Sequence, residues 1–147
     1  MNRTSIVIQA RLGSTRLKNK VLKKIYGKTI IEIMMDRLSL SKYSENIIIA
    51  IPNNKQNKQL YFFLKKRGLN VQVGDEHNVL KRFYRIAKNN NLKNIIRLSS
   101  DCPFIDHKII ELMSKKFFKK KLDYISTSKK FADGLDCEMI NYKSLEK

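Results

Sequence analysis

Short runs of β-branched residues alternate along the chain with longer stretches that repeat apolar residues at helical spacing. The short runs are too continuously apolar for strands with one face in water, so they predict buried strands. The predicted strands cover residues 6–8, 47–51, 71–73, 95–98 and 124–125.

The longer stretches predict four helices. The first begins with the capping box Thr29-x-x-Glu32, the second spans about 55–67 and stops at Gly68, the third spans about 79–90, and the fourth starts at Asp106. The side chains predicted to face inward are Ile30, Ile33, Met34 and Leu38, then Leu60, Phe63 and Leu64, then Val79, Leu80, Phe83, Ile86 and Ala87, then Ile109, Leu112, Met113 and Phe117.

Strands separated by single helices predict right-handed crossovers and a mostly parallel sheet. We find no repeat and no Pro- or Gly-rich linker, so residues 1–147 are predicted to form one α/β domain. Ligands of such sheets bind at the carboxyl ends of the strands, and the residues that follow each strand are therefore the candidates for chemistry.

The net charge of +18 is often a sign of nucleic-acid binding, but here the lysines are spread along the chain. Only residues 115–116 and 119–121 form a local cluster, on the polar side of an apolar helix. The charge therefore predicts attraction of anions in general. No apolar run reaches the roughly 18 residues of a membrane span, and the start of the chain lacks a signal-peptide core, which indicates a cytoplasmic protein. Cys102 and Cys137 have no metal-ligand spacing and are predicted to be buried thiols.

The segment after the first strand, residues 9–20, is the most basic loop. Arg11, Arg16 and Lys20 lie within it, and Gly13 allows backbone N–H groups to come close to an anion. Ser14 and Thr15 add hydroxyl donors. The loop thus suits a triphosphate, although it matches neither a P-loop nor a G-x-G-x-x-G turn; the alternative is an irregular basic surface loop.

Two acidic segments are further candidates. Asp101 follows the strand at 95–98, where a single carboxylate suits Mg²⁺, whereas Asp106 is better explained as a helix cap. Asp136 and Glu138 are predicted on one face of a short strand, where they either complete a metal site or line the wet face of an edge strand. His77 and His107 have no nucleophile pattern near them and are predicted to be surface or loop residues.

Taken in order, these segments resemble the cytidylyltransferase family, which includes the CMP-sialic-acid and CMP-Kdo synthetases, and in particular its spore-coat polysaccharide branch. The matching segments are 8–17 with 20–22, then 74–83, 101–106 and 133–138. The resemblance implies a Rossmann-like three-layer nucleotidyltransferase fold. It also implies that residues 74–82 lie near the nucleotide.

The resemblance implies individual roles as well. Arg11, Ser14, Arg16 and Lys20 would hold the triphosphate of CTP, with Ala10, Gly13 and Thr15 completing the nucleotide-binding loop. Asp101 would bind catalytic Mg²⁺, and Asp136 would supply a second carboxylate.

The sequence departs from the family pattern in two ways. Lys18-Asn19 replaces the usual Pro-Gly before the loop lysine, and Asn tolerates the left-handed backbone that this turn needs. Family members also extend well beyond 147 residues, so the domain is predicted to be truncated at its C-terminus. The part that is missing generally carries sugar contacts and the interface of a homodimer.

The implied reaction is transfer of CMP from CTP to an acidic, 2-keto acid sugar for surface polysaccharide synthesis, with release of pyrophosphate. Three alternatives stay open: a sugar nucleotidyltransferase that uses UTP or GTP, a non-catalytic shortened family member, and a basic nucleic-acid-binding module. The last requires a continuous basic face with interleaved aromatics. Because Phe63, Phe83 and Phe117 fall at inward positions, neither nucleic acid nor membrane is expected as a partner.

Overall fold

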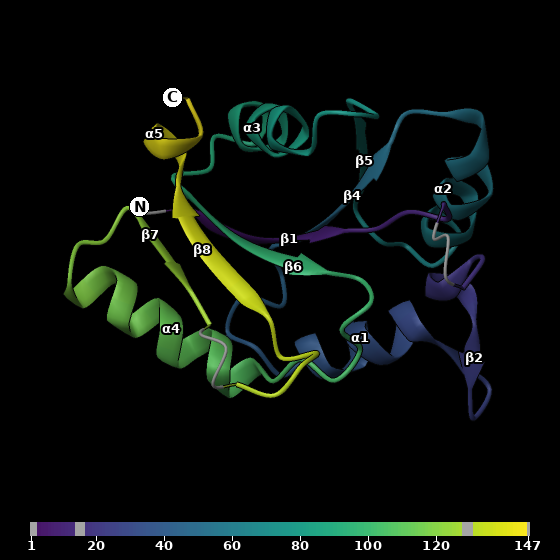
Figure 1. Ribbon diagram of the computed structural model, residues 1–147, viewed down its shortest axis with the longest axis horizontal. Coiled ribbons are helices and arrows are strands. Elements are labelled where there is room, and N and C mark those ends of the chain that lie inside the picture. Colours follow the sequence, from purple (N-terminus) through teal and green to yellow (C-terminus); the bar gives the residue numbers. More distant parts are fainter. Residues whose placement is uncertain (1–2, 14–16, 128–130, 147) are drawn as a thin grey trace.

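A computed structural model describes residues 3–13, 17–127 and 131–146. A six-stranded sheet with the order β5-β4-β1-β6-β8-β7 runs through the molecule (Figure 1). Its strands are β1 Thr4–Gln9, β4 Ile47–Pro52, β5 Val71–Gly74, β6 Asn94–Ser99, β7 Tyr124–Ser126 and β8 Cys137–Asn141; β2 Lys24–Ile25 and β3 Lys28–Thr29 form a separate small hairpin. The helices are α1 Ile30–Leu38, α2 Lys58–Lys65, α3 Val79–Asn89, α4 His107–Lys119 and α5 Tyr142–Leu145, with 3₁₀ turns η1 Lys20–Leu22 and η2 Lys55–Asn57.

The sheet is mostly parallel, as the alternation of strands and helices predicts. β5, β4, β1 and β6 are parallel neighbours, whereas β8 runs antiparallel to both β6 and β7. One prediction is wrong: residues 124–125 form an edge strand, β7, and not a buried one, because Tyr124 is 50% exposed. The residues that the structure describes between β7 and β8 contain no helix, and β8 returns antiparallel to β7 at this edge.

Two apolar cores lie on opposite faces of the sheet and make the fold three-layered. Side chains such as Ile8, Ile49 and Ile96 pack with α1, α2 and α4 on one face. Val7 and Ile95 pack with α3 and α5 on the other face. Figure 1 shows α3 and α5 on one side of the sheet and α1 and α4 on the opposite side. Strands buried on both faces explain why their sequences are continuously apolar.

The predicted helix ends are confirmed by their caps. Thr29 and Glu32 form a complete capping box at the start of α1, and the Asp106 side chain accepts a hydrogen bond from the Lys108 N–H at the start of α4. Gly68 follows α2 with a φ of 72°, a conformation that glycine adopts without strain.

Within the helices, the predicted inward face is wrong at two positions. Leu80 is 57% exposed and Leu112 is 65% exposed. In α4 the buried apolar side chains are those of Ile110, Met113 and Phe117, so the apolar stripe is rotated away from Leu112. Leu80 lies in the first turn of α3, where it borders an open cavity. No helix in the described parts of the chain has both the length and the apolarity of a membrane span.

Candidate functional site

The loop after β1 begins in the core and is tied to its neighbours by hydrogen bonds. Ala10 and Leu12 are buried, and the Leu12 N–H donates to Asn57 Oδ1 at 2.9 Å. The Asn19 N–H donates to the Leu12 carbonyl at 3.4 Å, which brings the two ends of the loop together. Ser14, Thr15 and Arg16 lie outside the described residues, so their predicted roles stay predictions.

Asn19 adopts the left-handed conformation that the sequence predicts for it. Its φ of 54° and ψ of 31° start the 3₁₀ turn η1, of which Lys20 is the first residue. This turn places the Lys20 side chain at the edge of the sheet, where it meets Asp101. A β-carbon at Gly13 would meet Gln56 Oε1 at 3.2 Å, so the loop lies tightly against η2.

Lys20 and Asp101, predicted from separate segments, meet across the end of the sheet. Lys20 Nζ lies 3.4 Å from Asp101 Oδ2, and the Ser99 hydroxyl donates to Asp101 Oδ1 at 2.5 Å. The Ser99 hydrogen bond and the Lys20 charge hold the pKa of Asp101 below its usual range, although partial burial opposes them. Asp101 is therefore an ionised carboxylate at neutral pH.

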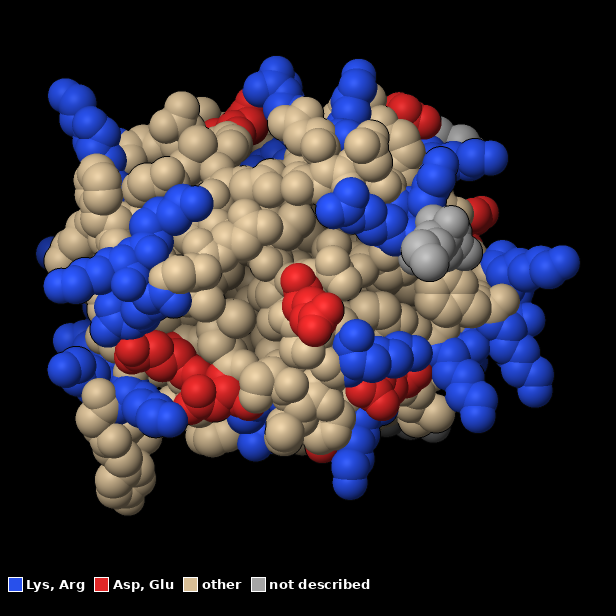
Figure 2. All heavy atoms as spheres, turned by 180° about the vertical axis from the view of Figure 1, so that it is seen from behind, with Lys and Arg blue, Asp and Glu red and all other residues tan. Residues whose placement is uncertain are grey.

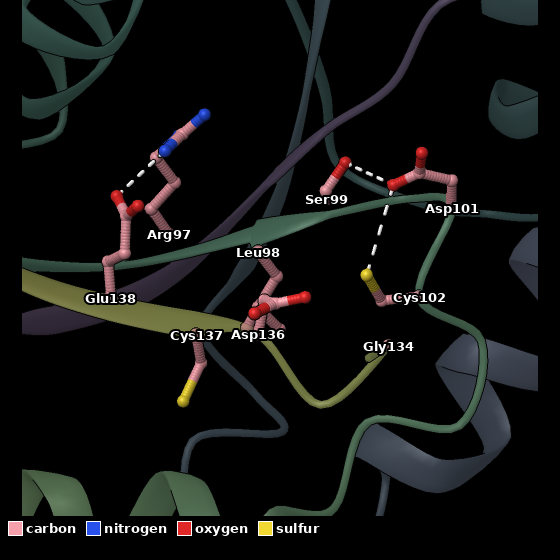
Figure 3. Close-up of a pocket in the computed structure, with 9 residues that line it drawn as sticks. All are labelled: Arg97, Leu98, Ser99, Asp101, Cys102, Gly134, Asp136, Cys137 and Glu138. Carbon is pink, nitrogen blue, oxygen red and sulfur yellow. Dashed lines mark hydrogen bonds and ion pairs between the residues drawn. The ribbon is translucent and has the colours of Figure 1, made fainter. Parts of the chain in front are cut away.

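A pocket of about 350 Å³ opens beside Asp101. Its lining comes from the end of β6, the turn that follows it, and the start of β8, and includes Asp101, Asp136 and Glu138. Figure 3 shows Ser99 and Asp101 at one end, an Arg97–Glu138 pair at the other, and Asp136 between them. β8 begins at Cys137, so Asp136 precedes the strand and is not part of it, but it still faces the same pocket as Glu138.

The donor chemistry of this pocket fits a hard divalent cation. Carboxylate oxygens of Asp101 and Asp136 line it, and Mg²⁺ takes one or two carboxylates together with water and phosphate oxygens. Within the described ranges, no three His, Cys, Asp or Glu side chains gather as a metal-binding cluster. The pocket thus offers open coordination, in which a phosphate would supply the other ligands, and not a closed protein cage.

A polar network that the sequence analysis missed joins three of the loops at this edge. Glu76 accepts from the Asn54 amide at 2.8 Å, and Asn54 Oδ1 accepts from the backbone N–H and the side-chain amide of Asn57. Asn57 in turn holds the Leu12 N–H, and its side chain is buried. The network connects the loops after β5 and β4 to the loop after β1. The Asn-rich segment after the second predicted strand is a sequence signal for this network. That segment does not reveal which distant residues its asparagines bind.

Arg82 is the largest polar side chain in the interior. It is 1% exposed, it donates to the Asp75 carbonyl at 2.7 Å, and its Nε has no hydrogen-bond partner among the described residues. Burial lowers the pKa of Arg82, although the negative charge of Asp75 opposes this shift. A β-carbon at Gly74 would lie 2.8 Å from Arg82 Cγ, so the glycine makes room for the arginine. The segment 74–82 follows β5, which runs parallel to β4 and β1, so it lies at the same edge of the sheet as the loop after β1.

The remaining candidates are two cysteines, which also line the pocket, and two histidines, which do not. Cys102 and Cys137 are free and buried, as predicted, and burial raises the pKa of Cys137 to about 12. His77 is exposed, and His107 is the first residue of α4. On the face shown in Figure 2, Lys and Arg are scattered with Asp and Glu among them, uncharged surface separates them, and acidic atoms lie near the middle. The described residues of this face thus form no continuous basic surface.

The sequence model of the cytidylyltransferase family matches residues 5–144. The chain is 38% identical over 141 residues to the uncharacterized protein MJ1063 of Methanocaldococcus jannaschii, covering 96% of this chain and 58% of that protein. It is 33% identical over 128 residues to the spore coat polysaccharide biosynthesis protein SpsF of Bacillus subtilis, covering 84% of this chain and 53% of SpsF. The chain therefore spans a little over half the length of these relatives.

Solved structures agree with these similarities. A cytidylyltransferase from Leptospira borgpetersenii superposes with a TM-score of 0.93 at 33% identity, over 99% of this chain and 63% of that one. A CMP:2-keto-3-deoxy-manno-octonic acid synthetase complexed with CTP shares the fold, with a TM-score of 0.76 at 16% identity over 98% of this chain and 76% of that one. Together with the loop, the carboxylate and the pocket described above, these matches show that the chain belongs to the cytidylyltransferase family.

Proposed function

We propose that this chain carries the CTP site of an enzyme that transfers CMP to a hydroxyl of an acidic, 2-keto acid sugar and releases pyrophosphate. The observation that carries the proposal is the contact between Lys20 and Asp101, at 3.4 Å. It brings a cation of the basic loop beside an ionised carboxylate at the carboxyl ends of neighbouring parallel strands, where ligands of such sheets bind.

In the proposed reaction the sugar hydroxyl oxygen attacks the α-phosphorus of CTP. The bond from that phosphorus to the bridging oxygen breaks, pyrophosphate departs, and the hydroxyl proton is released. Arg11 and Lys20 lie at the edge where the triphosphate would bind, and their charges would stabilise the growing negative charge on pyrophosphate. Arg16 would add a third cation, as the family resemblance implies.

Asp101, with Asp136, would hold Mg²⁺ at the pocket. The bound ion would neutralise phosphate charge and polarise the phosphorus that is attacked. The residues of the chain do the positioning: Ser99 and Lys20 fix the Asp101 carboxylate, and Asn57 fixes the backbone of the loop. Little covalent chemistry is needed from the protein in such a transfer.

The relatives support the substrate classes. One is named for spore coat polysaccharide biosynthesis, and a 3-deoxy-manno-octulosonate cytidylyltransferase of Solibacter usitatus is 31% identical over 107 residues, which cover 71% of this chain and 41% of that protein. We propose a product for surface polysaccharide synthesis, made in the cytoplasm by a homodimer of the longer protein. Thermal stabilisation by CTP, UTP, GTP and ATP, each with Mg²⁺, distinguishes CMP transfer from transfer of another nucleotide.

Pyrophosphate release from CTP in the presence of acidic sugars tests the activity. We expect Arg16→Ala and Asp101→Asn each to lower the rate by about 100-fold or more, since each removes charge stabilisation at the reacting phosphates. Near-wild-type rates in either variant would refute the site assignment. A wild-type chain that binds CTP and Mg²⁺ but releases no pyrophosphate with any acceptor would instead favour the non-catalytic alternative.

A further inference from the structure

Arg97 occupies an unusual place on the sheet. It lies in β6, on the face of the sheet where Val7 and Ile95 belong to the same apolar core as Phe83 of α3. The Arg97 guanidinium lies 5.8 Å from the Phe83 ring centroid, and the Arg97 side chain is 40% exposed. A strand position of this kind is most often apolar, so the guanidinium calls for an explanation.

Side chains of both neighbouring strands fix the guanidinium. Arg97 Nη1 donates to Glu138 Oε2 at 2.7 Å from β8, its direct cross-strand partner, and Arg97 Nη2 donates to Gln9 Oε1 at 3.2 Å from β1. Among the described residues these are the two hydrogen bonds of the guanidinium, which leaves it further N–H donors. An arginine held in one orientation loses little entropy when it binds a planar anion through two parallel hydrogen bonds.

The charges around the pocket give this arginine a distinct role. Of the described residues that line it, Arg97 is the one cation, against the carboxylates of Asp101, Asp136 and Glu138. An acidic ligand entering this pocket is repelled by the carboxylates unless its own charge is met by a cation. Figure 3 shows the guanidinium at the opposite end of the pocket from Asp101.

The spacing along β6 suits a 2-keto acid sugar. In such a sugar the carboxylate and the anomeric hydroxyl are bonded to the same carbon atom. Arg97 and Ser99 lie two residues apart on one face of the strand, about 7 Å along it, and Ser99 is hydrogen-bonded to Asp101. A carboxylate on Arg97 therefore places the adjacent hydroxyl toward Asp101, and the pocket of about 350 Å³ is of a size for one monosaccharide.

We propose that Arg97 binds the carboxylate of the acceptor sugar and thereby selects acidic over neutral acceptors. This inference rests on the proposed function, since it assigns the acceptor end of the same site. Glu138 and Gln9 act as positioning residues that orient the guanidinium toward the pocket. The competing explanation is a purely structural cross-strand ion pair.

The test compares 3-deoxy-manno-octulosonate, the substrate named for a relative, with its neutral methyl ester. Binding of each is measured in the absence of nucleotide, and binding of CTP is measured separately. We expect the wild-type protein to bind the acid more tightly than the ester. Arg97→Gln should weaken binding of the acid by about tenfold to a hundredfold and abolish the preference, because a charge-assisted bidentate contact is lost. Arg97→Lys keeps the positive charge but not the planar pair of N–H donors, so it should retain part of the preference for the acid.

Arg67→Gln is a matched control. Arg67 pairs with Glu32 at 2.6 Å and its side chain is 36% exposed, which resembles the Arg97–Glu138 pair, but Arg67 lies in the turn after α2, Glu32 lies on α1, and neither lines the pocket. We expect it to bind both sugars and CTP as the wild type does. Retained preference for the acid in Arg97→Gln, or no preference in the wild type, overturns the role of Arg97. CTP binding and pyrophosphate release with a neutral acceptor would then leave CMP transfer itself standing.

Discussion

The proposed site lies at the edge of the sheet where the parallel strands end, and the two halves of this edge differ in both architecture and charge. On one side, the loops after β1, β4 and β5 follow parallel strands, and the segment after β1 carries Arg11 and Lys20. On the other side, the pocket between β6 and the antiparallel β8 presents three carboxylates and one arginine. The Lys20–Asp101 contact is where the two halves meet.

In the proposed reaction, this difference suits one substrate to each half. A triphosphate brings several negative charges, which the basic half can neutralise, whereas the acidic half repels it unless a divalent cation is present. The acidic half is also where the single reversed strand, β8, brings Asp136 and Glu138 toward Asp101. Substitutions at the edge should therefore separate effects on CTP from effects on metal and acceptor.

The largest effect is expected at the contact between the halves. Lys20→Ala removes a cation that would face the departing pyrophosphate, so kcat/KM for CTP should fall by about 100-fold, while KM for the acceptor changes little. Steady-state pyrophosphate release measures both constants. Lys20→Arg should recover part of the loss because it keeps the charge. If KM for the acceptor rises as much as KM for CTP, the two halves do not bind separate substrates.

A smaller effect is expected on the acidic side. Asp136→Asn removes one carboxylate from the pocket, so about tenfold more Mg²⁺ should be needed for half-maximal activity. CTP binding without the metal should stay unchanged. Asp133→Asn is the control, because Asp133 is exposed in the same loop and is not among the residues lining the pocket. An equal Mg²⁺ requirement in both variants would remove Asp136 from the metal site.

The contrast between the halves also marks what the sequence predicts and what it does not. The β-branched runs at 47–51 and 95–98 predict strands because burial on both faces demands continuous apolar sequence. Thr29, Gly68 and Asp106 predict helix ends because each satisfies a local backbone requirement. Lys20 and Asp101 could be proposed as site residues because they follow strands that end at the same edge.

Features that depend on distant partners could not be predicted in this way. Asn57 holds Leu12 across 45 residues, and Asn54 holds Glu76 across 22 residues. The side on which Leu112 lies depends on how α4 is rotated against the sheet, which helical spacing alone does not determine. Glu138 lies opposite Arg97 because β8 pairs antiparallel with β6 in one particular register, and helical or strand periodicity does not determine that register.

The polar network around Asn57 allows a test of whether the loop after β1 must be anchored for CTP to bind. Asn57→Ala leaves the buried Leu12 N–H without its acceptor, which should cost about 1–3 kcal/mol of stability. It should also raise KM for CTP severalfold, because the loop backbone loses its anchor. Asn57→Asp keeps the acceptor oxygen but loses the amide that donates to Asn54 Oδ1 and buries a carboxylate, so it should recover little of the lost stability. Asn70→Ala, at an exposed position, is the control for denaturant unfolding and for kinetics. Lower stability with an unchanged KM for CTP would make Asn57 a purely structural residue.

The smallest effect is expected where neither half is touched. At the start of α1, the Thr29 hydroxyl, the Arg67 guanidinium and the Thr29 N–H lower the pKa of Glu32 from 4.5 to about 2. Because the folded pKa is depressed, this stabilisation is present above about pH 4.5 and is lost as the pH falls toward 2. Glu32→Gln should therefore lower the melting temperature by a few degrees at pH 7 and less at pH 3, with kcat and both KM values unchanged. A change in KM for CTP in this variant would show that the basic half depends on more of the fold than its own loops, and would weaken the separation of the two halves.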